Sequence, residues 1–372
     1  MRHFELEKFF STWEFKARHH MTASDTESLS LNDLLVLGTA EQRDAFNQLW
    51  LGYTETWGAP ELLAEIASTY DAQKPSNILT FAGAGEGIYA AMRVMLKATD
   101  HAIVVVPNYQ SAETVPLQIC QVSGVLLHED NQWRLDMDEV RAAIRPTTKL
   151  ISINFPNNPT GALMPESDLD ALIALCREFG LYLFSDEVYR LTELDPALRM
   201  PQIADAYEKG LSLNVMSKAY GLPGLRIGWI ATQDTELLQA IERYKHYLSI
   251  CNSGPSEFLS IVALQNRESL LMRNRTLIKS NRALLDDFLH RHQNLMQWVP
   301  PQGGCVGFVR YLHEESATSF CNRLVEEHGV LLLPASLYGS ELMHYAPNSF
   351  RIGFGRKQFP EGLKAFELAL AS

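Results

Sequence analysis

The segment NVMSKAYGLPGLRIGWI, residues 214–230, places two cations inside a run that is otherwise mostly apolar. Its pattern predicts a strand that ends at Lys218, a turn rich in glycine and proline, and a second strand that begins near Arg226. Lysine and arginine are rarely buried without a partner. The segment therefore raises the question of why two cations lie in a run that is otherwise typical of a buried one.

The segment belongs to a series of short apolar runs, several of them separated by amphipathic helical patterns. The runs span residues 77–81, 101–107, 124–129, 149–156, 181–188, 211–217 and 225–232. Continuous apolar strands that alternate with helices are typical of a parallel sheet covered on both faces. We therefore predict an α/β fold with a mainly parallel seven-stranded sheet sandwiched by helices. The last two runs, joined by a tight turn, could form an antiparallel exception.

The pattern changes after about residue 290, where short strands with polar connections replace the alternation. These strands are CVGFVRYL, GVLLLPASLYG and SFRIGFG. We expect a large domain at residues 46–288 and a smaller α+β domain at residues 289–372. Residues 1–45 are expected to form an N-terminal segment that packs on the small domain.

Composition narrows the class of protein. A length of 372 residues suits two structural units, and the formal net charge of −12 argues against a nucleic-acid partner. No apolar run approaches the ~18 residues of a membrane span, and the N-terminus lacks the apolar core of a signal peptide. Five scattered cysteines without a CxxC motif favour free thiols in a reducing compartment. We expect a cytoplasmic protein that binds neither nucleic acid nor membrane.

Polar or aromatic residues follow five of the predicted strands. In doubly wound sheets, ligands bind at the carboxyl ends of the strands, so these residues are candidates for one site. They are the glycine-rich turn at residues 83–87, Tyr109, Asn158, Asp186 with Tyr189, and Lys218.

Each candidate also has an ordinary structural explanation. Lys218 alone could be a surface lysine, Asp186 could cap a helix, and Arg351 in SFRIGFG could form a buried ion pair. The glycine-rich turn could be a tight connection from strand to helix. It is not the dinucleotide pattern GxGxxG, because Ile88 stands at the last position.

Taken together, these candidate residues indicate a more specific function than any one of them does alone. A desolvated lysine has a lowered pKa and can form a Schiff base, and a helix N-terminus with glycines can bind a phosphate. Pyridoxal phosphate needs a lysine, an acid against its ring nitrogen and a phosphate site. The residues Lys218, Asp186 and Arg226, with the glycine-rich turn, offer all three.

Four motifs resemble a known family. SKAYGLPGLRIGW, NFPNNPTG, SDEVY and FRIGFGR are similar to the pyridoxal-phosphate enzymes of the aspartate aminotransferase superfamily, class I/II, fold type I. They occur in the family's order and span roughly residues 50–356. PNYQS and VMSKAYGLPGLRIGW more narrowly resemble the capreomycidine synthase-like branch.

The resemblance implies a role for each matched residue. It makes Lys218 the carrier of the internal aldimine and the group that moves the substrate proton, and it makes residues 46–288 the cofactor-binding domain. It implies that Asp186 binds the pyridine nitrogen, that Tyr109 stacks on the face of the cofactor ring, and that Asn158 and Tyr189 hydrogen-bond the ring's 3-oxygen. It also implies that Arg351, with Asn158, binds the substrate carboxylate. The resemblance further implies that the phosphate is bound by the backbone amides of Ala84 and Gly85 and by Arg226. It also implies that Tyr53 reaches the phosphate of a neighbouring subunit, so that the protein is a homodimer with shared active sites.

The sequence departs from the family's pattern at two places. Val215 occupies a position three residues before the lysine where the family often has Ser or Thr on the phosphate, and the adjacent Ser217 could replace that contact. The N-terminal segment is unlike that of the best-known members. It should line or cap the substrate pocket.

The resemblance implies an enzyme that moves an amino group between an L-amino acid and a 2-oxo acid. Another pyridoxal-phosphate reaction on the same scaffold, such as elimination, cyclisation or oxidation, is the alternative, and a non-catalytic sensor is a third. No HExxH motif or metal-spaced cluster occurs, so we predict no metal site. Arg310 and Arg356 could bind a second substrate carboxylate or be solvated. We expect Trp50, Tyr53 and Trp57 on a helix, at a core or interface.

Overall fold

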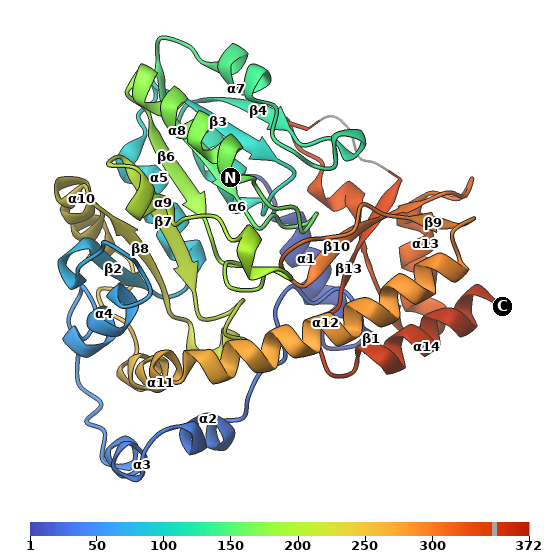
Figure 1. Ribbon diagram of the computed structural model, residues 1–372, viewed down its shortest axis with the longest axis horizontal. Coiled ribbons are helices and arrows are strands. Elements are labelled where there is room, and N and C mark those ends of the chain that lie inside the picture. The colour runs from blue at the N-terminus through green and yellow to red at the C-terminus, as the bar shows by residue number, and fades with distance from the viewer. Residues whose placement is uncertain (344–347, 372) are drawn as a thin grey trace.

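The computed structural model describes residues 1–343 and 348–371. Its centre is a seven-stranded sheet with the order β2-β8-β7-β6-β5-β3-β4. Only β8 runs antiparallel to its neighbours, β2 and β7. The predicted α/β class, the mainly parallel sheet of seven strands and the antiparallel last pair are thus confirmed (Figure 1). The strands are β2 (Ile78–Phe81), β3 (His101–Val106), β4 (Gln121–Leu126), β5 (Thr148–Asn154), β6 (Tyr182–Asp186), β7 (Gly210–Val215) and β8 (Gly228–Thr232).

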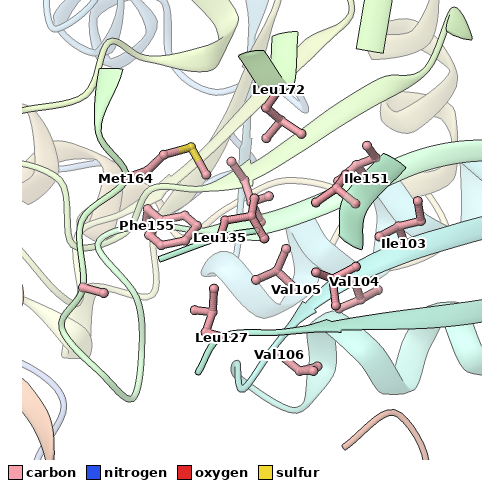
Figure 2. Packing of buried hydrophobic residues seen from close by; sticks show 14 of the residues in the cluster. Ile103, Val104, Val105, Val106, Leu127, Leu135, Ile151, Phe155, Met164 and Leu172 are labelled. Atoms are coloured by element: carbon pink, nitrogen blue, oxygen red, sulfur yellow. The ribbon is translucent and has the colours of Figure 1, made fainter. Parts of the chain in front are cut away.

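The central strands are apolar throughout because helices bury both faces of the sheet. Along β5, Leu150 packs in one core cluster and Ile151 in the other, as alternation of side chains across a strand requires. The first cluster contains residues of α5 (Ala84–Met95) and α10 (Thr235–Lys245). The second, part of which Figure 2 shows, contains residues of α7 (Met137–Ala143) and α8 (Glu166–Phe179).

A second, smaller sheet lies toward the C-terminus, with the order β12-β13-β10-β9 and antiparallel pairing. Helix α12 (Arg267–Arg291) runs from the region of α11 (Gly254–Gln265) to this sheet (Figure 1). The strands are β9 (Met296–Gln297), β10 (Val306–Tyr311), β12 (Leu333–Pro334) and β13 (Ser349–Gly353), and the helices here are α13 (Ala317–Arg323) and α14 (Phe359–Leu370).

The N-terminal residues contact both parts of the molecule. Strand β1 (His19–His20) pairs in parallel with β11 (Val330–Leu331), whereas α2 (Leu31–Leu37) contacts α11 of the large part. Helix α1 (Glu5–Trp13) begins where the Glu5 amide donates to Gln110 Oε1. The remaining helices are α3 (Ala40–Asn47), α4 (Pro60–Ala67), α6 (Ser111–Leu117) and α9 (Ile203–Ala206). In the described part of the chain, every helix is too short or too polar to cross a bilayer.

Two local expectations were wrong. The last sheet strand begins at Gly228 rather than 225, because Pro223–Leu225 forms a 3₁₀ turn and Arg226 has a left-handed φ of 52°. The expected helix around Trp50, Tyr53 and Trp57 is absent: α3 ends at Asn47 and α4 begins at Pro60, with an irregular connection between them. Gly58, with φ 118°, adopts a conformation that no helix contains.

Candidate active site

A cavity of about 360 Å³ opens at the carboxyl ends of β5, β6 and β7. Parallel strands end at one edge of a sheet, so residues far apart in the sequence meet here. Nine of the site residues predicted from the sequence line it: Ala84, Gly85, Tyr109, Asn158, Asp186, Tyr189, Ser217, Lys218 and Arg226. The N-terminal segment supplies a further wall that includes Glu7, Glu14 and Ser24. The segment that we expect to line or cap the substrate pocket thus lines this cavity.

Lys218 follows β7 and extends into the cavity wall. Its Nζ donates a hydrogen bond to Ser24 Oγ at 2.9 Å and lies 5.8 Å from the centroid of the Tyr189 ring. Burial lowers the pKa of the Lys218 ammonium, while the nearby Asp25 carboxylate acts in the opposite direction. A desolvated amine of this kind is a better nucleophile at neutral pH than a surface lysine.

Asp186 is the last residue of β6 and is buried. Burial raises the pKa of its carboxyl group to about 6, against the opposing effects of the Val188 amide and the Lys218 charge. Its Oδ1 accepts a hydrogen bond from the Val188 amide at 3.2 Å. Within the described residues Oδ2 accepts none, so this oxygen is available to a ligand with an N–H donor.

The N-terminus of α5 and Arg226 line the same cavity. Gly83, the residue before α5, has a left-handed φ of 94°, and a Cβ atom there would lie 2.5 Å from Arg226 Nη2. A side chain at this position would push the guanidinium away from the helix end. Arg226 Nη1 also donates to Ser217 Oγ at 3.4 Å. Free amides at a helix N-terminus with an adjacent guanidinium are typical of a phosphate site.

Arg351 of β13 is buried behind this cavity and is not one of its lining residues. Its Nη1 donates to Tyr338 Oη at 2.8 Å and to Asn158 Oδ1 at 3.1 Å, and its Nη2 donates to the Thr22 carbonyl at 2.7 Å. All these acceptors are neutral, and no described residue forms an ion pair with Arg351. The alternative that Arg351 forms a buried ion pair is therefore wrong for the described residues. A buried guanidinium without an anion is suited to a carboxylate ligand.

Tyr109 joins the cavity to the N-terminal helix. Its hydroxyl group donates to Glu7 Oε1 at 2.9 Å, and its ring lies 5.1 Å from that of Phe4. Burial, with the Glu7 charge, raises the pKa of Tyr109. The hydroxyl group therefore stays protonated and keeps helix α1 against the cavity.

Three residues that the sequence suggested for the site lie elsewhere or pair differently. Tyr53 does not line the cavity, and 84% of it is exposed. Arg310 pairs with Glu129 at 2.6 Å and Arg356 pairs with Asp25 at 2.7 Å, so neither is a free, solvated cation.

Sequence reasoning named none of the individual N-terminal residues at the site. Glu7, Glu14, His20, Ser24 and Asp25 line the cavity, and Tyr338 contacts Arg351 from the small part of the molecule. The only sequence signal was the departure of the N-terminal segment from the family's pattern. Nothing in its periodicity indicates which of its side chains reach the cavity.

These residues fit pyridoxal phosphate. The Lys218 amine, the open Asp186 oxygen and the glycine cradle that a Cβ would fill match its aldehyde, ring nitrogen and phosphate. Among the described residues Arg351 has neutral partners only, and a substrate carboxylate would give it an anionic one. The donor set alone therefore fits a pyridoxal-phosphate enzyme.

Comparison with known proteins gives the same class. The family model for aminotransferase class I and II matches residues 25–361, and the chain belongs to this family. The protein is a pyridoxal-phosphate-dependent aminotransferase, a transferase of fold type I, as the four motifs predicted.

Individual relatives are diverse. Capreomycidine synthase from Streptomyces vinaceus is 26% identical, over 99% of this chain and 93% of its own. An arginine–pyruvate transaminase from Pseudomonas aeruginosa is 29% identical, over 77% of this chain and 75% of its own. A solved pyridoxal-phosphate-dependent aminotransferase from Streptococcus suis matches with a TM-score of 0.93 and 30% identity, covering 100% of this chain and 98% of that one. The pyridoxal-phosphate-dependent cyclase OrfR shares the fold, with a TM-score of 0.90, 24% identity and coverage of 100% and 97%.

Proposed function

We propose that Lys218 is the residue that binds the cofactor and that this site moves an amino group from an L-amino acid to a 2-oxo acid. The observation that carries the proposal is the buried Lys218 amine, which shares one cavity with Asp186 and the N-terminus of α5. When bound, pyridoxal phosphate supplies an aldehyde that condenses with amines and a ring that withdraws electrons from the substrate.

The chain's own residues position the groups that react. Lys218 would hold the cofactor, and its amine, when not bonded to the cofactor, would move the proton at the substrate α-carbon. Asp186 would accept a hydrogen bond from the ring nitrogen and keep that nitrogen protonated. Arg351 would orient the substrate carboxylate together with Asn158, whose Oδ1 accepts a hydrogen bond from Arg351 Nη1.

The other residues that line the cavity would hold the rest of the cofactor. Tyr109 would cover one face of the ring, and Tyr189 with Asn158 would hydrogen-bond its 3-oxygen. The amides of Ala84 and Gly85, together with Ser217 and Arg226, would bind the phosphate. Val215, which lines the same cavity, has no polar group that could bind the phosphate. The hydroxyl group of Ser217, which accepts a hydrogen bond from Arg226, would take the place of the Ser or Thr that the family often has at position 215.

A homodimer completes the proposal. Trp50, Leu51, Tyr53 and Tyr247 are 78%, 80%, 84% and 89% exposed, and a hydrogen bond from Thr54 Oγ1 to the Asn252 carbonyl connects the two loops that carry them. Such a cluster of exposed aromatic and aliphatic side chains favours a protein interface. There, Tyr53 would reach the phosphate site of the second copy.

Two further assignments remain proposals. We assign residues 46–288 to the cofactor-binding domain, residues 289–372 to the small domain and residues 1–45 to an N-terminal segment that packs on the small domain. The five cysteines, all within the described residues, are free thiols, which supports a reducing, cytoplasmic compartment.

Cyclisation of a modified amino acid is the second candidate function. It is favoured by the similarity to capreomycidine synthase along nearly the whole chain. Product analysis separates the two, because amino transfer leaves the cofactor as the amine and needs a 2-oxo acid to restore it. A cyclised product formed without an oxo acid would replace the first proposal.

The assignment of Lys218 can be tested by reduction with borohydride and peptide mass mapping. The chain offers an internal comparison, because Lys245 is also buried and burial lowers its pKa to about 8. We expect the reduced cofactor on Lys218 alone, and none after Lys218→Ala, which should also abolish turnover. Cofactor attached to Lys245, or turnover by the Lys218→Ala variant, would overturn the proposal.

A further inference from the structure

The carboxylates of the cavity outnumber its cations. Four line it, from Glu7, Glu14, Asp25 and Asp186, whereas Lys218 and Arg226 are the cations among the described lining residues. His20 also lines the cavity, but burial and the nearby arginines lower its pKa to about 4, so its ring is neutral at pH 7.

Two of the four carboxylates already have a function or a partner. Asp186 lies at the end of β6, where the proposed function places the ring nitrogen. Asp25 accepts three hydrogen bonds from the Arg356 guanidinium, at 2.7, 2.8 and 3.1 Å. Among the described residues, Glu7 and Glu14 are left without a cationic partner at hydrogen-bond distance. Glu7 accepts the Tyr109 hydroxyl at 2.9 Å, and Glu14 lies 4.0 Å from the neutral His20 ring.

The two glutamates lie on one side of the N-terminal helix. They are seven residues apart, which is about two helical turns, so both face the cavity from α1 and its C-cap. Partial burial raises the pKa of Glu14, and the charges of Glu7 and Asp25 raise it further, whereas the charges of Arg356 and Lys218 act in the opposite direction. The two carboxylates therefore repel each other, and a cation between them would relieve that repulsion.

Apolar side chains line the same wall. Leu6 and Phe10, one turn apart on α1, face the cavity beside the glutamates. A substrate with an aliphatic stem and a terminal cation would place methylene groups on this wall and its charge at Glu7 and Glu14. Both glutamates are also exposed to solvent, so a neutral side chain would leave them hydrated, whereas an acidic one would meet like charge.

We propose that Glu7 and Glu14 select an amino acid whose side chain ends in a guanidinium or ammonium group. This inference rests on the proposed function, in which Arg351 would hold the α-carboxylate and Lys218 would act on the reacting amine. The chemistry required of the substrate is an α-amino acid head, an aliphatic stem and a terminal cation.

The test compares matched substrates with the holoenzyme in single-turnover reactions. L-arginine and L-citrulline have nearly the same shape but differ in side-chain charge, as L-lysine and L-norleucine differ in a terminal ammonium. We expect kcat/KM for L-arginine to exceed that for L-citrulline by roughly tenfold or more. Raising the salt concentration should reduce the ratio.

Variants then assign the preference to the two side chains. Glu7→Gln and Glu14→Gln should each lower the arginine-to-citrulline ratio by roughly threefold or more, and Glu14→Lys should favour L-glutamate over L-citrulline. The Gln side chain at position 7 can still accept the Tyr109 hydroxyl, so a lost contact there would not explain the change. Glu5→Gln is the matched control, because it removes one charge from the same helix at a residue that does not line the cavity. It should leave the ratio unchanged.

Failure of this inference differs from failure of the proposed function. Conversion of L-citrulline or L-glutamate as fast as L-arginine, or a ratio that Glu5→Gln changes as much as Glu14→Gln, overturns the inference alone. If no amino acid in the panel, including L-alanine, reacts with the holoenzyme, amino transfer fails and the inference fails with it. A single-turnover measurement distinguishes these outcomes, because it needs no knowledge of the oxo acid.

Discussion

The amino group of Lys218 lies 2.9 Å from the hydroxyl oxygen of Ser24, a residue 194 positions earlier in the chain. The Ser24 carbonyl in turn accepts the Tyr189 hydroxyl at 2.6 Å. One residue of the N-terminal segment therefore contacts both the proposed cofactor lysine and a residue proposed to bind the cofactor's 3-oxygen. The segment forms part of the site and does not merely cover it.

Ser24→Ala should shift the pH dependence of the reaction. Ser24 Oγ accepts a hydrogen bond from the Lys218 ammonium and so favours the charged form. Its loss should lower the pKa of Lys218 further and reduce kcat roughly tenfold, because the amine loses its orientation. The pH profile of single-turnover rates would show the shift, and Ser24→Thr should restore most of it. An unchanged profile in Ser24→Ala would mean that the contact has no functional role.

Cofactor affinity should depend on the protonation of Asp186. Burial raises the pKa of Asp186 to about 6, so below that pH the carboxyl group becomes neutral and loses its attraction for a protonated ring nitrogen. Affinity should therefore fall as the pH drops through about 6, by up to roughly tenfold per pH unit. Fluorescence titration of the cofactor-free protein with pyridoxal phosphate measures this dependence.

Asp186→Asn separates this effect from titration of the cofactor itself. The variant should bind more weakly above pH 6 and should lack the part of the pH dependence that belongs to Asp186. Asp168→Asn is a suitable control, because Asp168 pairs with Arg134 and does not line the cavity. Identical pH curves for the wild type and Asp186→Asn would contradict the role given to this carboxylate.

Arg351→Lys should weaken the use of every amino acid substrate. Lysine keeps the charge but loses the planar fork that matches a carboxylate, and a loss of about 3 kcal/mol would lower kcat/KM roughly 100-fold. Cofactor affinity should change little, because Arg351 does not line the cofactor's cavity. Arg310→Lys, on the adjacent strand β10, provides the control. Equal effects of the two substitutions would show that the loss is structural.

Charge in the exposed cluster around Leu51 should prevent dimer formation. Leu51→Asp combined with Tyr247→Asp would bury two unpaired carboxylates in the proposed interface, which is strongly unfavourable. Analytical ultracentrifugation should show a dimer for the wild type and a monomer for the double variant. Leu368→Asp changes a similarly exposed leucine on α14 and should leave the dimer intact. A monomeric wild type would overturn the proposed assembly.

The sequence by itself determined the sheet and one half of the site. Apolar runs without polar alternation require a sheet buried on both faces, and the polar residues that follow such strands meet at one edge. Asn158, Asp186 and Lys218 could therefore be placed together from the sequence, because strand direction alone brings them to that edge. The turn after Lys218 was less predictable, because Arg226 has a left-handed φ of 52° that non-glycine residues rarely adopt.

Only the tertiary structure decided the other half of the site. Ser24, Glu7 and Glu14 reach the cavity through the pairing of β1 with β11 and the contact of Glu7 with Tyr109. These contacts join residues about 100 to 310 positions apart. Local propensity and periodicity describe neighbours along the chain, and they contain no information about such distances. The chemistry of the cofactor site was thus readable from the sequence, whereas the charge of the substrate pocket depended on how the N-terminal segment packs.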